Sequence, residues 1–167
     1  HFWLDPVIVR DVICPPLAEE LIKLLPEKEE EIRSNLNCYQ DKLTALDQEI
    51  RSTTATFRQR KFISLHAAWK YFARRYGLEE VAVVTDSPGQ EPSAGWVTEI
   101  IDIAVNNNVG AIFAEPQLPL SLAERIAEET GAKVFVLDPL GGPQLPGRET
   151  YLDLMRYNLN IFKTALN

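Results

Sequence analysis

The chain has 167 residues, of which 46% are hydrophobic and 25% are charged, a composition typical of a folded domain with one buried core. Its formal net charge of -7 argues against phosphate contacts through clustered Lys and Arg, so we expect no nucleic-acid partner. No apolar run approaches the roughly 20 residues that a helix needs to cross a bilayer.

Cys14 and Cys38 are the only cysteines of the chain. A single pair at this spacing forms neither a zinc finger nor a CxxC redox motif. Two interpretations stay open, because the spacing says nothing about geometry. Either the two thiols form a disulfide in an oxidising compartment, or both are small buried apolar residues.

A long helix is expected in the first third of the chain, because residues 27–76 contain neither glycine nor proline. Alternating steps of four and three residues form one mostly apolar stripe, as in an amphipathic helix. The stripe consists of Ile32, Leu36, Tyr39, Leu43, Leu46, Ile50, Thr53 and Phe57. Such a helix is roughly 38 Å long, more than one small lobe needs. We therefore predict a strut packed against other parts of a monomer, with a coiled-coil dimer as the alternative.

From Arg60 onward, short β-rich runs alternate with helical segments, which is the pattern of βαβ units. The expected strands are KFISL (61–65), VAVVT (81–85), AIFA (111–114) and KVFVL (133–137), and the expected helices are 67–77, 93–108, 120–131 and 149–167. These strands lack alternating polar residues, so both faces of the sheet should be covered. We predict an α/β fold in which a long connecting helix precedes a lobe with a four-stranded parallel sheet flanked by helices.

A titratable residue follows each expected strand: His66, Asp86, Glu115 and Asp138. In an open parallel sheet, ligands bind beyond the carboxyl ends of the strands. One imidazole and three carboxylates suit a divalent cation. Asp86 and Glu115 are also typical turn or helix-cap residues, and we expect them to play supporting roles. A cap role is equally natural for Asp138 before Pro139, and a lone histidine such as His66 is often structural.

Six segments carry a family resemblance, in this order: HFWLDP (1–6), SLHAAWKYFARRYGL (64–78), EPS (91–93), FAEPQ (113–117), GAKVFVLDPLGG (131–142) and YLDLMRYNLNIFKTAL (151–166). Together they resemble the solute-binding proteins of zinc and manganese ABC importers. In that family one long rigid helix joins two α/β lobes, and the metal lies in the cleft between them. The resemblance implies that residues 1–59 hold the end of an N-terminal lobe and the interlobe helix, and that residues 60–167 form the C-terminal metal-binding lobe.

The same resemblance implies three metal ligands: His1 from HxWLDP, His66, and Asp138 from the LDPLG segment. The first ligand histidine of the family lies before the position of His1, so the ligand set within this chain is incomplete. Manganese members often carry glutamate at the position of His66. Histidines with one carboxylate suit zinc, so we expect Zn²⁺ rather than Mn²⁺.

The implied function is that of an extracytoplasmic receptor, which captures zinc and delivers it to an ABC permease without a catalytic step. It would be periplasmic, or extracellular and anchored by a lipid. One alternative is a manganese receptor, adhesin or metallochaperone of the same fold. Another is a metal-dependent α/β hydrolase that uses the strand-end carboxylates as acid and base. The hydrolase is disfavoured, because the chain has no nucleophile elbow, P-loop or GxGxxG motif and only two histidines.

Overall fold

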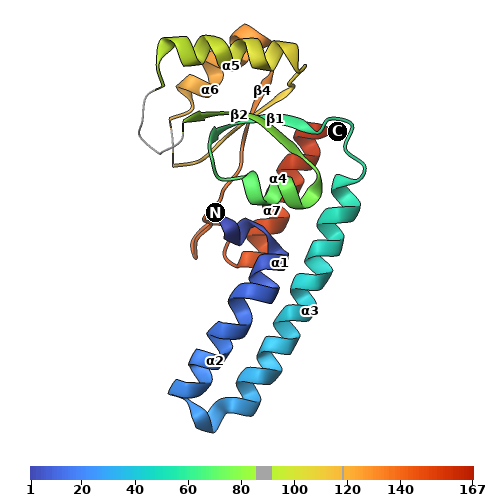
Figure 1. Ribbon diagram of the computed structural model, residues 1–167, viewed down its shortest axis with the longest axis vertical. Coiled ribbons are helices and arrows are strands. Elements are labelled where there is room, and N and C mark those ends of the chain that lie inside the picture. The colour runs from blue at the N-terminus through green and yellow to red at the C-terminus, as the bar shows by residue number, and fades with distance from the viewer. Residues whose placement is uncertain (86–91, 118) are drawn as a thin grey trace.

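A helical hairpin and an α/β lobe make up the computed structural model, which describes residues 1–85, 92–117 and 119–167 (Figure 1). The hairpin consists of η1 (Phe2–Leu4), α1 (Pro6–Ile8), η2 (Val9–Ile13), α2 (Cys14–Leu24), η3 (Pro26–Lys28) and α3 (Glu29–Thr54). The lobe follows with β1 (Lys61–His66), α4 (Lys70–Tyr76), β2 (Glu79–Thr85), α5 (Ala94–Asn106), β3 (Ala111–Ala114), α6 (Ser121–Thr130), β4 (Lys133–Val136) and α7 (Tyr151–Leu166). Among the helices described, none is long and apolar enough to span a membrane.

The four strands form one parallel sheet, as predicted, and their order in it is β2-β1-β3-β4. Helices cover both of its faces. Phe62 of β1 packs into the apolar cluster that includes residues of α3, α4 and α7, whereas Ile63 and Leu65 pack into the cluster with α5 and α6. Because all strands are parallel, their carboxyl ends meet at one edge, and the residues that follow them gather there.

An aromatic group packs α4 and α7 against the first of these faces. Phe162 of α7 stacks on Phe72 of α4 with ring centroids 4.8 Å apart, and its edge contacts include Phe113 at 4.7 Å and Trp69 at 5.4 Å. Phe162 and Phe72 are fully buried. Aromatic packing of this kind dominates core energetics, so α7 is held rigidly beneath the sheet.

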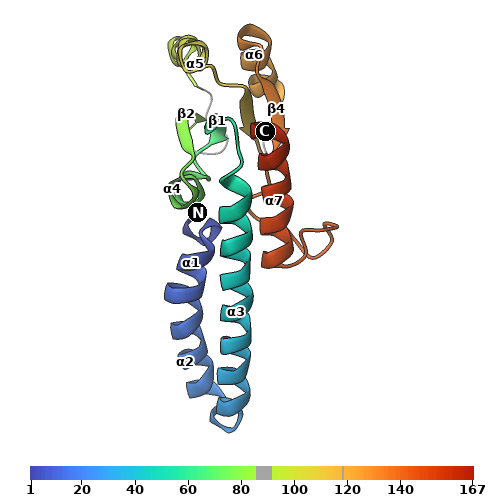
Figure 2. The ribbon, with the colours of Figure 1, turned by 90° about the vertical axis from the view of Figure 1, so that its right-hand side faces the viewer.

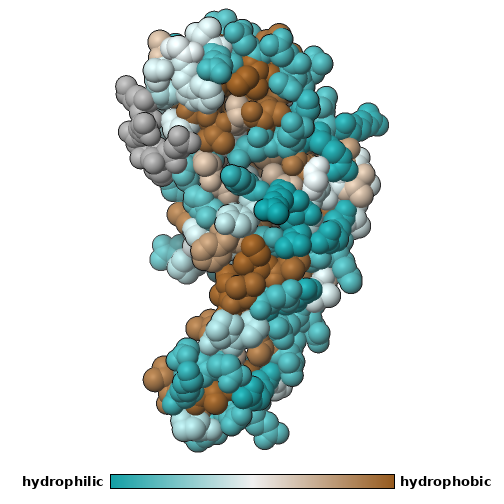
Figure 3. Space-filling view, in the orientation of Figure 1, coloured by the Kyte–Doolittle hydropathy of each residue, from teal (hydrophilic) through white to brown (hydrophobic). Residues whose placement is uncertain are grey.

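The long predicted helix is α3, and its apolar stripe is confirmed as far as Thr53, whereas Phe57, predicted as its last residue, lies beyond the end of the helix. Leu43, Leu46 and Ile50 are completely buried, whereas Ile32 and Leu36, nearer its start, are only half-buried. Figure 2 shows the reason: the first part of α3 projects beyond the lobe and is accompanied there by α2 alone. The opposite side of α2 stays open, with Leu17, Leu21 and Leu24 exposed, and Figure 3 shows hydrophobic surface on this projecting part.

Helix α2 was not predicted, because Pro15 and Pro16 interrupt its pattern. A proline inside a helix lacks the N–H donor and clashes with the carbonyl four residues before it. The chain avoids this with the π-helical turn η2, in which the Cys14 N–H bonds to the Val9 carbonyl. The wider turn leaves room for the rings, so the helical path continues through both prolines.

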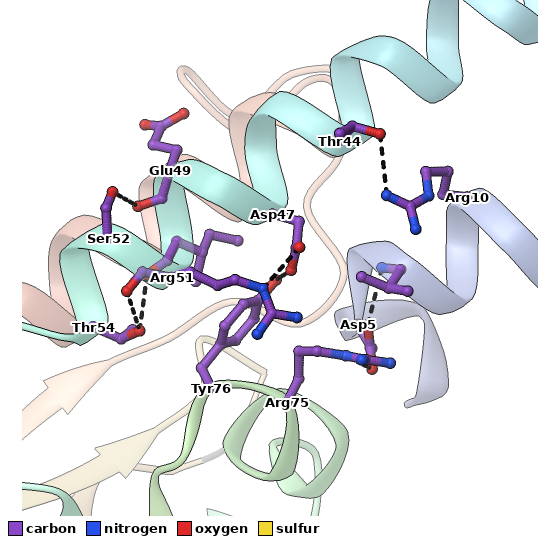
Figure 4. Close-up of polar contacts among 12 residues, drawn as sticks. Asp5, Arg10, Thr44, Asp47, Glu49, Arg51, Ser52, Thr54, Arg75 and Tyr76 are labelled. Atoms are coloured by element: carbon purple, nitrogen blue, oxygen red, sulfur yellow. Dashed lines mark hydrogen bonds and ion pairs between the residues drawn. The ribbon is translucent and has the colours of Figure 1, made fainter.

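Polar contacts fix α3 to the lobe (Figure 4). Buried Asp47 of α3 accepts hydrogen bonds from the Arg51 Nε at 2.9 Å and from the Tyr76 hydroxyl of α4 at 3.1 Å. Beside it, Arg75 of α4 donates to Asp5 at 2.7 Å and so ties the N-terminal segment to the same helix. These contacts couple three segments that are distant in sequence.

The structure differs from the sequence-based predictions at the start of α4 and at the cysteines. A helix was expected directly after His66, but α4 begins only at Lys70, because a tight turn in which the Ala68 N–H bonds to the His66 carbonyl at 2.8 Å comes first. The two interpretations of the cysteines also fail. Both thiols are free; Cys14 is half-buried and packs against the core, whereas Cys38 is exposed on α3, so the pair is neither bridged nor buried together.

Candidate metal centre

His66 is the last residue of β1 and is buried, with 8% of its surface exposed. Its Nδ1 lies 3.1 Å from the Glu115 Oε1. When the Glu115 carboxylate is ionised it can only accept a hydrogen bond, so the imidazole then carries its proton on Nδ1. The other ring nitrogen, Nε2, then keeps a free lone pair, which is the form of histidine that binds a metal ion.

Glu115 follows β3 and is also buried. Burial raises the pKa of Glu115, and the negative charge of Asp138 adds to this effect, whereas His66 opposes it. The sequence predicted a supporting role for Glu115, and the structure places its carboxylate against a candidate ligand. A carboxylate bonded to the back of a histidine orients the ring and increases its basicity as a ligand.

His1 lies against His66, with ring centroids 5.0 Å apart and planes inclined by 87°. The Nδ1 of His1 is 3.4 Å from the Ala67 carbonyl, in the turn that follows β1. The edge of Trp3 meets the His1 ring at a centroid distance of 4.9 Å. Two imidazoles that are far apart in the sequence are thus brought together at the carboxyl edge of the sheet.

Asp138 follows β4 at the same edge and is completely buried. Its Oδ1 accepts hydrogen bonds from the Leu140 and Gly141 N–H groups, both at 3.0 Å, and its Oδ2 accepts one from Arg148 at 2.9 Å. Burial raises the pKa of Asp138, but the N–H groups of Gly141 and Leu140, with Arg148, outweigh burial and hold the pKa below its ordinary value. The carboxyl is therefore ionised and already has partners.

The turn at Asp138 depends on a glycine. Gly141 has a φ of +64°, and a Cβ at this position would lie 2.6 Å from the Arg148 carbonyl. Only glycine combines this backbone conformation with so close an approach of another chain segment. The Gly142 N–H also bonds to the Arg148 carbonyl at 3.1 Å, so the turn brings Arg148 back to Asp138.

The predicted site residues are therefore only partly assembled. The structure pairs His1 with His66 and adds Glu115, whereas Asp138 is engaged by Arg148 instead. Over the residues described, 1–85, 92–117 and 119–167, no three His, Cys, Asp or Glu side chains are placed to hold one metal ion together. Asp86, predicted to support the site, lies outside the described residues.

Sequence reasoning missed Arg148 and Asn158. Asn158 is fully buried, accepts a hydrogen bond from the Asp138 N–H at 2.8 Å and donates to the Asp138 carbonyl at 2.7 Å. One signal pointed to it: Asn158 lies between Leu154 and Phe162 on the apolar face of α7, where a polar residue needs a partner. Arg148 lies in a loop without periodicity, and no local pattern marks it.

Residues 1–165 match the family described as zinc-uptake complex component A, periplasmic (ZnuA). The chain is 31% identical over its full length to the high-affinity zinc uptake system protein ZnuA of Brucella suis, of which it covers 50%. It is 32% identical to the ZnuA protein of Bacillus subtilis, with 99% of this chain and 53% of that protein covered.

The crystal structure of the laminin-binding protein Lbp of Streptococcus pyogenes is similar to the whole chain, with a TM-score of 0.88 and 33% identity. The match covers 100% of this chain and 65% of that one. The chain spans about half the length of the curated zinc-uptake relatives that it matches.

Proposed function

Because the chain belongs to the family of periplasmic zinc-uptake component A proteins (ZnuA), we propose that it is the metal-binding part of a zinc receptor for an ABC importer. The pairing of His1 with His66 carries this proposal. Neutral imidazoles are preferred zinc ligands, and the Glu115 contact leaves the Nε2 of His66 available. In this proposal Asp138 is the third ligand from the chain and supplies its negative charge.

Zinc is the proposed cargo rather than manganese. Two imidazoles and one carboxylate form a borderline-soft donor set, which suits tetrahedral zinc, whereas manganese prefers sites richer in carboxylate oxygen. The names of the ZnuA relatives, which describe zinc uptake, support the same choice.

We further propose that a preceding lobe completes the receptor. In this arrangement residues 1–59 end the N-terminal lobe and form the interlobe helix, and residues 60–167 form the C-terminal lobe. The relatives are about twice as long as the part that the chain covers, and the leucines exposed on α2 need a packing partner. A monomer of this kind, periplasmic or anchored outside the cell by a lipid, would hand zinc to its permease without a catalytic step.

Calorimetric zinc titration of the full-length protein tests the ligands. The His66→Ala variant should bind zinc more weakly by more than about 100-fold, because a direct ligand should cost more than an outer-shell partner. The Asp138→Asn variant should also lose affinity, and Asp153→Asn, at an exposed position on α7, is its matched control. Circular dichroism checks that each variant folds. Unchanged affinity of His66→Ala would remove His66 from the site and with it the proposed function.

The two-lobed arrangement has its own test. The chain of residues 1–167 should fold by itself, because its sheet is covered on both faces, but it should bind zinc much more weakly than the full-length protein. Losing a ligand and one wall of the cleft opens coordination positions to water and removes preorganisation. Equal zinc affinities would contradict a cleft shared between two lobes.

An adhesin role is the second candidate, because a solved structure with a TM-score of 0.88 is that of a laminin-binding protein. The two roles separate experimentally. A receptor binds zinc in the absence of laminin, whereas an adhesin must show saturable binding to immobilised laminin. Laminin binding that persists in His66→Ala would assign the adhesin role to a surface outside the metal centre.

A further inference from the structure

Trp3 connects the segment that carries His1 with the turn that carries Asp138. Its indole N–H donates to the Pro139 carbonyl at 2.9 Å, and its ring meets His1 at a centroid distance of 4.9 Å. A second hydrogen bond holds the same residue, because the hydroxyl of half-buried Tyr151 in α7 donates to the Trp3 carbonyl at 2.7 Å. Both hydrogen bonds join residues that lie at opposite ends of the chain.

The Pro139 carbonyl is a fixed point in the structure. In the preceding residue, Asp138, the backbone N–H and the backbone carbonyl are both hydrogen-bonded to the side chain of Asn158, which is fully buried in α7. The Leu140 and Gly141 N–H groups close the turn by donating hydrogen bonds to the Asp138 Oδ1. Because these bonds do not involve Trp3, the turn keeps its place without it.

The His1 ring, in contrast, has little other support. Its one polar contact among the described residues is the long one, 3.4 Å, to the Ala67 carbonyl. Downstream, Leu4 is buried in the core and Asp5 is held by Arg75, and these anchors fix the backbone after His1. Between them and His1 stands Trp3, which contacts the imidazole directly.

We propose that Trp3 is a positioning residue of the metal centre. The hydrogen bond from its indole N–H to the Pro139 carbonyl holds the N-terminal segment in place and so positions the His1 imidazole beside His66. This inference rests on the proposed function, in which both histidines bind zinc. A ligand that is held in place before the ion arrives loses less conformational freedom on binding, and the complex is tighter for that reason.

The Trp3→Phe variant removes the indole N–H and keeps an aromatic ring in place. Zinc binding by the full-length protein, with any histidine tag removed, should weaken on the order of tenfold, as for other groups that orient a metal ligand. Tyr151→Phe removes the second hydrogen bond and should weaken zinc binding in the same direction. The matched control is Trp96→Phe, because the Trp96 indole also donates to a backbone carbonyl, that of Val84, at 3.1 Å. Its helix lies on the opposite face of the sheet, and its zinc affinity should match wild type.

A double-mutant cycle separates positioning from general loss of structure. If Trp3 acts through His1, Trp3→Phe should change zinc affinity less than about twofold in a His1→Ala background, since coupled residues are not additive. A loss of the same size in both backgrounds would overturn the proposal, as would wild-type affinity of Trp3→Phe. If His1→Ala and His66→Ala themselves bind zinc like wild type, the proposed function fails, and the role of Trp3 fails with it.

Discussion

Removal of Arg148 should strengthen zinc binding if Asp138 is a ligand. The guanidinium lies 2.9 Å from the Asp138 Oδ2, and the two side chains are only 18% and 0% exposed. A hydrogen bond to a charged group of this kind contributes about 1.5–3 kcal/mol. In this prediction zinc takes the place of Arg148 at this oxygen, so the metal-free state holds this free energy and the zinc-bound state does not. At about 1.4 kcal/mol for each factor of ten, the Arg148→Met variant should bind zinc roughly tenfold to a hundredfold more tightly.

Loss of the contact between Arg148 and Asp138 should also lower the stability of the metal-free protein. Without zinc, Arg148→Met should lower the free energy of unfolding by about 2 kcal/mol, or Tm by about 4–8 °C, because a buried carboxylate loses its counter-charge. Methionine can keep the apolar contact over the Tyr157 ring, which the guanidinium now covers at 4.7 Å. The Nε of Arg148 is buried without a hydrogen-bond partner in the described part of the chain, so hydration of this group on release offsets part of that cost.

The control for this experiment is Arg156→Met, which breaks an ion pair with Glu49 in which both side chains are 43% exposed. Exposed pairs contribute about 0–1 kcal/mol, so its zinc affinity and Tm should stay near wild type. Isothermal titration calorimetry and thermal unfolding measure both quantities on the same samples. Zinc affinity of Arg148→Met equal to or below wild type would refute the competition between Arg148 and the ion.

Three further predictions concern the rest of the molecule. Tyr76→Phe should lower the free energy of unfolding by about 1 kcal/mol, because Asp47 loses one of its donors, and chemical denaturation measures this. Burial raises the pKa of Glu80, so its stabilising contribution is present at low pH and is lost as pH rises through the folded-state pKa. Glu80→Gln should therefore lose less stability than wild type between about pH 4 and pH 7 in thermal unfolding. Titration of the unfolded, unreduced protein should find both Cys14 and Cys38 as free thiols.

Each of these has an outcome that would contradict it. An unchanged unfolding free energy in Tyr76→Phe would mean that the hydroxyl exchanges its bond for water at no cost. A steeper loss of stability with rising pH in Glu80→Gln would reverse the sign expected from burial. Recovery of no reactive thiol before reduction would show a disulfide, and would require α2 and α3 to pack differently at Cys14.

The sequence predicted those elements of the fold in which apolar residues follow a regular local pattern. The stripe through Leu43, Leu46 and Ile50 predicted α3, because helical geometry places such residues on one face and burial selects apolar side chains there. The apolar runs after Arg60 predicted the four strands of a parallel sheet for the same reason. Helix α2 escaped prediction, because two prolines mask its periodicity and only the π-helical turn makes them acceptable.

For the candidate site, the sequence by itself determined that His66, Glu115 and Asp138 lie at or just beyond the ends of strands, since each directly follows an apolar run. It did not determine their partners. The contact of His66 with Glu115 and the capture of Asp138 by Arg148 exist only in the tertiary structure. The physical reason is that periodicity records which face of an element is buried, whereas these contacts join segments far apart in the chain, and only the packing of the sheet and α7 brings them within hydrogen-bonding distance.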